Sequence, residues 1–127
     1  MVRQLLVEPH ALLARALRIG LDEEGFAIDA VVDQKEADER LCAGAYDVIV
    51  LDLPGDHSRE TLRRWRLGGL RTPVLLVTEP GREAERCGEA AVNNFATLNK
   101  PFGLKDLLAR LRTLAGNNGN QEKVAGL

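Results

Sequence analysis

Short runs of β-branched and other apolar residues recur along this chain at regular intervals, and this spacing limits the fold more than any other feature. The runs occupy residues 3–8, 27–32, 48–52, 74–78 and 95–98. Helical spacing of apolar residues fills the gaps, at 11–24, 34–42, from 58 onward, 83–91 and from 101 onward. Alternating strands and helices predict right-handed crossovers and a parallel sheet covered on both faces. We therefore expect an α/β fold, a doubly wound (βα)5 arrangement around a five-stranded parallel sheet.

Residues with known preferences for helix ends support these boundaries. Asp33 precedes the second helical segment and is a candidate N-cap, while Gly25 closes the first segment. Ser58 begins the third segment with a partial Ser-x-x-Thr capping pattern. Pro101 suits the first position of the last helix. These helix-end residues predict short connections between all of the elements.

Length and charge exclude several classes of protein. A chain of 127 residues with 45% hydrophobic residues is long enough for one domain with a core, and its net charge is −2. No apolar stretch approaches the roughly 20 residues of a membrane span, so we expect a cytoplasmic protein without membrane contact. The arginine-rich segment 59–71 is interrupted by Glu60. We interpret it as a solvated helix face and not as a nucleic-acid site.

Polar residues of three chemical types follow the apolar runs. Glu8 follows the first run, Asp52 ends the third, Thr78 ends the fourth, and Lys100 comes just after the fifth. In a doubly wound sheet the ligand or reaction site lies beyond the carboxyl ends of the strands. A carboxylate at the end of the most apolar stretch is costly unless a partner compensates it. We therefore expect these four side chains to form one site.

The motifs LLVE, YDVIVLDLPG, TPVLLVT and NKPF, in this order, resemble the receiver domain (CheY-like) of bacterial two-component response regulators. The resemblance covers residues 1–116. Residues 117–127 break the helical periodicity, so we expect a flexible tail, and the resemblance implies that it is a linker towards a possible output domain. It also implies that Asp52 accepts a phosphoryl group from a histidine kinase. Thr78 is then the switch hydroxyl and Lys100 the amine that contacts the phosphate. Two acidic residues after the first strand hold Mg²⁺ in such proteins.

This sequence departs from the family pattern at the metal and switch positions. The acidic pair falls on Glu8 and Pro9, and proline has no side-chain oxygen. Glu8 and Asp52 are thus the candidate metal ligands, and we expect Mg²⁺ to bind weakly. The aromatic switch position falls on Thr97, with Phe95 as the nearest aromatic residue. These departures predict an atypical receiver.

Glu79 and the loop after Asp52 add two further departures. Glu79 stands where the family usually has a small residue, and its charge would repel an incoming phosphate. The loop after Asp52 is two to four residues shorter than usual, which affects the backbone carbonyl that normally completes the metal shell.

Other readings of the same residues stay open. Asp52 would be a simple turn cap, although this leaves Thr78 and Lys100 unexplained. In a further interpretation, Lys100 forms a permanent ion pair with Asp52 and does not bind phosphate. A flavin or nucleotide binder would need Gly, Ser or Thr after the first strand, where the chain has EPHALL. A small hydrolase would use His10 or His57 but lacks a Ser or Cys beside them.

The resemblance therefore predicts a signalling domain and not an enzyme. Its expected partners are a histidine kinase or another signalling protein, with a homodimer through residues 83–114. DNA is expected only through an output domain outside this chain. The alternative is an ordinary receiver that a histidine kinase phosphorylates on Asp52.

Overall fold

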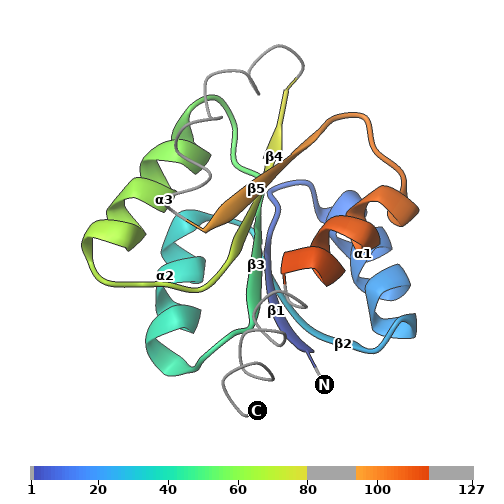
Figure 1. The fold of residues 1–127 in the computed structure, drawn as a ribbon, viewed down its shortest axis with the longest axis horizontal. Helices are drawn as coiled ribbons and strands as arrows, with labels where there is room; N and C mark the ends of the chain where they lie inside the picture. Colours follow the sequence, from blue (N-terminus) through green and yellow to red (C-terminus); the bar gives the residue numbers. More distant parts are fainter. Residues whose placement is uncertain (1, 80–93, 115–127) are drawn as a thin grey trace, which may run out of the picture.

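A five-stranded parallel sheet forms the centre of the molecule, as the sequence predicts (Figure 1). The computed structural model describes residues 2–79 and 94–114. The strand order is β2-β1-β3-β4-β5, and every neighbouring pair is parallel. The strands are β1 (Val2–Val7), β2 (Phe26–Val31), β3 (Val48–Leu51), β4 (Val74–Thr78) and β5 (Phe95–Asn99).

Helices cover both faces of the sheet, with α2 and α3 on one side and α1 and the C-terminal helix on the other (Figure 1). Their bounds are α1 (Ala11–Glu23), α2 (Gln34–Ala43) and α3 (His57–Leu67), and the C-terminal helix is described over residues 104–114. The predicted helix at 83–91 and the predicted tail at 117–127 lie outside the described residues. No helix in the described part of the chain is long and apolar enough to cross a membrane.

Alternation along the central strands divides the core into two clusters. Leu6 faces the α1-side cluster, which Leu21 of α1 and Leu107 of the C-terminal helix complete. Leu5 faces the opposite way, into the α3-side cluster with Leu62 and others. Because successive side chains of a strand point to opposite faces, all five strands supply residues to both clusters.

Two predicted helix boundaries are confirmed by their local hydrogen bonds and backbone angles. The Asp33 side chain accepts a hydrogen bond from the Glu36 N–H at 2.9 Å, and Glu36 accepts one from the Val32 N–H at 3.0 Å. This reciprocal pair is a form of capping box. Gly25, with φ of +95°, takes the left-handed conformation that ends α1.

Two other predicted helix starts are wrong. Helix α3 begins at His57, and the Ser58 hydroxyl is not its cap but accepts from the Leu53 N–H at 2.8 Å. The last helix begins at residue 104 and not at Pro101, because the Gly103 carbonyl accepts the first helical bond from Leu107. Residues 101–103 therefore form a connection beside the carboxyl end of the sheet.

Candidate phosphoacceptor site

Backbone hydrogen bonds continue the sheet pairing by one residue beyond the strands and so place the site residues. The Glu8 N–H donates to the Val31 carbonyl and the Asp52 N–H to the Val7 carbonyl, each at 2.9 Å. The Lys100 N–H donates to the Thr78 carbonyl, also at 2.9 Å. These residues therefore share one edge of the sheet, as the sequence predicts.

Asp52 and Lys100 form an ion pair at the centre of this edge. Lys100 Nζ lies 3.0 Å from Asp52 Oδ2, with side-chain exposures of 27% and 11%. Burial acts to lower the pKa of Lys100, but the hydrogen bond and charge of Asp52, together with Glu8 and Glu79, raise it above the ordinary value. The amine therefore stays protonated and partly neutralises the carboxylate.

Glu8 is almost completely buried, with only 1% of its surface exposed. Its Oε1 accepts a long hydrogen bond of 3.4 Å from the His10 N–H, and no hydrogen-bond donor among the described residues reaches its Oε2. Burial raises the pKa of Glu8 to about 8, helped by a hydrogen bond to Asp52 and by the charge of that carboxylate. This raised pKa favours the protonated form of Glu8 near neutral pH, a form that can share its proton with Asp52.

The donor set at this edge tests whether the residues suit a magnesium ion. Glu8 and Asp52 supply carboxyl oxygens, and the unpartnered Glu8 Oε2 is a free ligand atom once its proton has left. Mg²⁺ accepts one or two carboxylates when waters fill its remaining positions. The residues therefore fit the ion only in the form in which Glu8 is ionised. Among residues 2–79 and 94–114, however, no three His, Cys, Asp or Glu side chains gather in a possible metal site.

Thr78 is buried and donates its hydroxyl proton to Oδ1 of Asn99 at 2.6 Å. The two residues are partners at the last position of the β4–β5 register, which brings their side chains together. Thr78 also lines a small cavity of about 20 Å³ together with Asp52. The sequence alone did not indicate a role for Asn99. The signal was present in the NKPF motif, where a polar amide precedes the lysine.

The two candidates for the second switch position lie on β5 in different surroundings. Phe95 is buried in the α3-side cluster, at the opposite end of the strand from the site. Thr97 is half-buried and pairs in register with Leu76. Its carbonyl accepts a hydrogen bond from Arg110 at 2.7 Å. A switch role for either residue stays a prediction.

Comparison with known proteins points to the same family as the site residues do. The sequence profile of the response regulator receiver domain matches residues 5–112. The chain is 34% identical over 122 residues to the transcriptional regulatory protein QseB of Escherichia coli O157:H7, covering 94% of this chain and 56% of QseB. It is 35% identical over 119 residues to PmrA of Pectobacterium parmentieri, with coverages of 92% and 54%. The chain thus spans about half the length of these relatives.

Solved structures have the same fold. The receiver domain of the Francisella response regulator 1452 superposes with a TM-score of 0.83 at 22% identity, covering 93% of this chain and 99% of that one. A response regulator receiver protein from Sinorhizobium medicae superposes with a TM-score of 0.70 at 26% identity, covering 91% and 94%.

Proposed function

Because this chain belongs to the response regulator receiver domain family, we propose that it is an atypical receiver with little or no magnesium-dependent phosphorylation of Asp52. The observation that carries this proposal is the burial of Glu8 next to Pro9, where the family has a second acid. Glu8 is a buried carboxyl group with a pKa of about 8, beside a proline that offers no ligand oxygen. The metal half of the site is therefore poorly prepared, while the lysine half is intact.

Charge balance explains why a weak metal site hinders the transfer of a phosphoryl group to Asp52. A carboxylate and a phosphoryl group repel each other, so nearby positive charge must offset this repulsion before the carboxylate can attack. Lys100 supplies one cation for this purpose. A bound divalent cation supplies the rest in such sites. Glu8 must lose its proton before it can bind that ion, which weakens binding near neutral pH. Glu79 adds an exposed negative charge close to Lys100.

The proposed role is regulation through protein contacts. The relatives are named transcriptional regulatory proteins, and this chain matches about half of each. We take it as the regulatory part of a cytoplasmic, DNA-binding transcription regulator, whose DNA contacts belong to an output domain. Its partners are a histidine kinase or another signalling protein, and its dimer face lies within residues 83–114. The domain keeps one conformation as its working state.

The second candidate is an ordinary receiver that a histidine kinase phosphorylates on Asp52. The meeting of Asp52, Thr78 and Lys100 at one edge of the sheet favours it. Glu8 with His10 would then bind a divalent ion such as Mn²⁺, which accepts nitrogen ligands more readily than Mg²⁺. The two candidates differ in one measurable quantity, the amount of phosphorylated Asp52.

Intact-mass spectrometry after incubation with acetyl phosphate and either Mg²⁺ or Mn²⁺ separates them. We expect almost no product of about 80 Da added mass in the natural sequence. The variant Pro9→Asp, which restores a second acid, should gain this product with Mg²⁺. Asp52→Asn in the Pro9→Asp background is the matched control and should lose it. Stoichiometric labelling of the natural sequence that vanishes in Asp52→Asn would establish the ordinary switch instead.

A further inference from the structure

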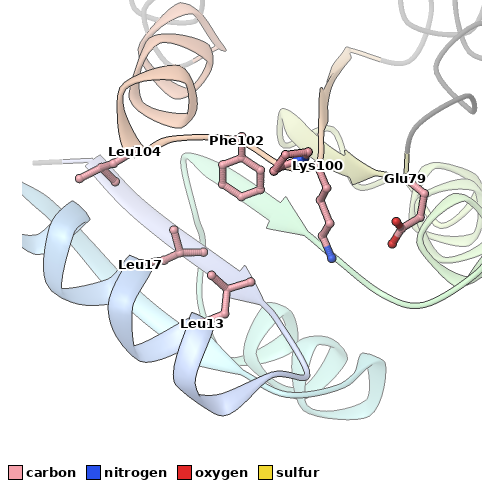
Figure 2. Close-up of a pocket in the computed structure, with 7 residues that line it drawn as sticks. Leu13, Leu17, Glu79, Lys100, Phe102 and Leu104 are labelled. Carbon is pink, nitrogen blue, oxygen red and sulfur yellow. The ribbon is translucent and has the colours of Figure 1, made fainter.

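A concave apolar pocket lies between α1 and the connection that follows β5 (Figure 2). Its volume is about 530 Å³. Its lining includes four apolar side chains and two charged ones: Leu13, Leu17, Phe102, Leu104, Lys100 and Glu79. The two leucines of α1 face the aromatic ring of Phe102, and Lys100 and Glu79 lie at the other end of the pocket (Figure 2).

The fold builds this pocket from elements on one face of the sheet. Leu13 and Leu17 are four residues apart on α1, so that they lie one turn above the other. Gly20, one turn further on, lets Leu104 approach α1 closely, because a Cβ on Gly20 would lie only 2.8 Å from Leu104 Cδ2. The start of the C-terminal helix thereby closes one end of the pocket. The other end opens beside the Asp52–Lys100 ion pair.

Size and shape favour a small molecule over a protein segment. Small-molecule sites are concave, mostly apolar, and about 300–1,000 Å³ in volume, with a few polar groups that orient the ligand. Stable protein interfaces instead bury about 800 Å² on each partner. The pocket fits the first description in its volume, in its lining and in the position of its charges at one end.

The charges at the open end define the chemical class of the ligand. Lys100 Nζ is held by Asp52 at 3.0 Å, and Glu79 is exposed nearby. The ammonium of Lys100 and the carboxylates of Asp52 and Glu79 leave a net negative charge, so an anionic head group is repelled at this end. A cationic head group is attracted by Glu79 but repelled by the ammonium beside it. A neutral carbonyl, hydroxyl or N–H group meets no repulsion, since the ammonium has further protons to donate and Glu79 accepts.

We propose that this pocket binds an uncharged, mainly apolar small molecule, which places one neutral polar group at the Lys100–Glu79 end. The ligand contacts Lys100, which is paired with Asp52, and so adjusts the position of the amine without any phosphoryl group. This control by a ligand does not depend on phosphorylation of Asp52. It therefore stands or falls separately from the proposed loss of magnesium-dependent phosphorylation.

A pair of related dyes tests both the pocket and the ligand class. N-phenyl-1-naphthylamine is uncharged and carries one N–H group, and anilinonaphthalene sulfonate has the same rings with an added anionic group. We expect saturable fluorescence enhancement with the neutral dye and affinity about tenfold weaker for the sulfonate. In Glu79→Gln the difference between the two dyes should shrink. Tighter binding of the sulfonate would overturn the ligand class.

Two neighbouring leucines supply the matched variants. Leu13→Arg places a charge in the pocket and should weaken binding of the neutral dye about tenfold or more. Leu12→Arg alters the adjacent residue, which is 84% exposed and does not line the pocket, and should leave binding unchanged. Equal losses in both variants, or no saturable binding to the natural sequence, would refute the proposal.

Methyl NMR of the natural sequence makes the test independent of how the variants fold. The neutral dye should shift the methyl signals of Leu13, Leu17 and Leu104. It should not shift those of Leu62, which packs in the α3-side cluster on the other face of the sheet. Dye-induced shifts that spare the three lining leucines would also refute the proposal.

Discussion

The Asp52–Lys100 ion pair is the contact on which the state of the site depends. Both groups are largely removed from solvent, and two further carboxyl groups, Glu8 and Glu79, act on the same amine. The loss of Lys100 leaves Asp52 beside Glu8 without a cation, whereas the loss of the Asp52 charge relieves Glu8. The two partners of the pair are therefore not equivalent.

We expect Lys100→Met to destabilise the protein more than Asp52→Asn does. The coupling energy of the pair should be about 1–3 kcal/mol, because breaking a partly buried pair leaves an uncompensated charge. Urea unfolding of both single variants and the double variant gives this energy directly. Additive effects of the two substitutions would mean that no energetically important pair exists.

Glu8 makes the stability of the fold depend on pH. Its carboxyl group has a pKa of about 8 in the folded protein, above its ordinary value of 4.5. Between these values the folded state holds a proton that the unfolded state releases. The stability that the protonated Glu8 contributes to the fold is therefore fully present below about pH 4.5 and is lost as the pH rises through about 8.

Relative to Glu8→Gln, the natural sequence should lose stability as the pH rises from 5 to 8, by up to a few kcal/mol. Urea unfolding with a chelator present, at steps of one pH unit, measures the difference. Glu23→Gln removes an exposed carboxyl group of α1 and is the control. A constant difference between Glu8→Gln and the natural sequence across this range would contradict the raised pKa.

Strand β1 carries one polar side chain in an otherwise apolar face of the sheet. Gln4 is completely buried between its register partners Ile28 and Val48. Among the described residues, neither its amide nitrogen nor its amide oxygen has a hydrogen-bond partner. A buried amide without partners costs free energy of folding, and a thioether of similar shape avoids this cost.

Gln4→Met should therefore raise the free energy of unfolding by about 1–2 kcal/mol. Gln34→Met, at the start of α2, is the contrasting variant, because it removes the hydrogen bond that Gln34 Oε1 accepts from the buried Thr61 hydroxyl at 3.2 Å and should lower the stability. Chemical denaturation of both variants measures the change. Destabilisation by Gln4→Met would contradict the cost assigned to the buried amide.

The two core clusters lie on opposite faces of one sheet and share its central strands. Leu5 and Leu6 are adjacent in β1 yet pack in different clusters, and β3 and β4 alternate in the same way. Neither cluster can lose its strands while the other keeps them. The described part of the molecule should accordingly unfold in one cooperative step.

Trp65, the single tryptophan, tests this cooperativity because it packs only in the α3-side cluster. Its fluorescence should change at the same urea concentration as the far-ultraviolet circular dichroism, which reports the helices on both faces. Asp38→Ala removes the hydrogen bond from Trp65 Nε1. It should shift both transitions equally. Separate midpoints for the two signals would contradict a single step.

Local pattern was sufficient for the strands, for the capped start of α2 and for the meeting of Glu8, Asp52, Thr78 and Lys100 at one edge. Strand periodicity, Asx capping and the geometry of parallel sheets act over a few residues or follow from connectivity. Local pattern did not predict four features: the start of the C-terminal helix, the Thr78–Asn99 hydrogen bond, the raised pKa of Glu8 and the pocket beside Leu13. Each of these depends on distances and burial among side chains that are far apart in sequence. Folding sets those quantities, because desolvation and charge coupling are properties of the packed chain.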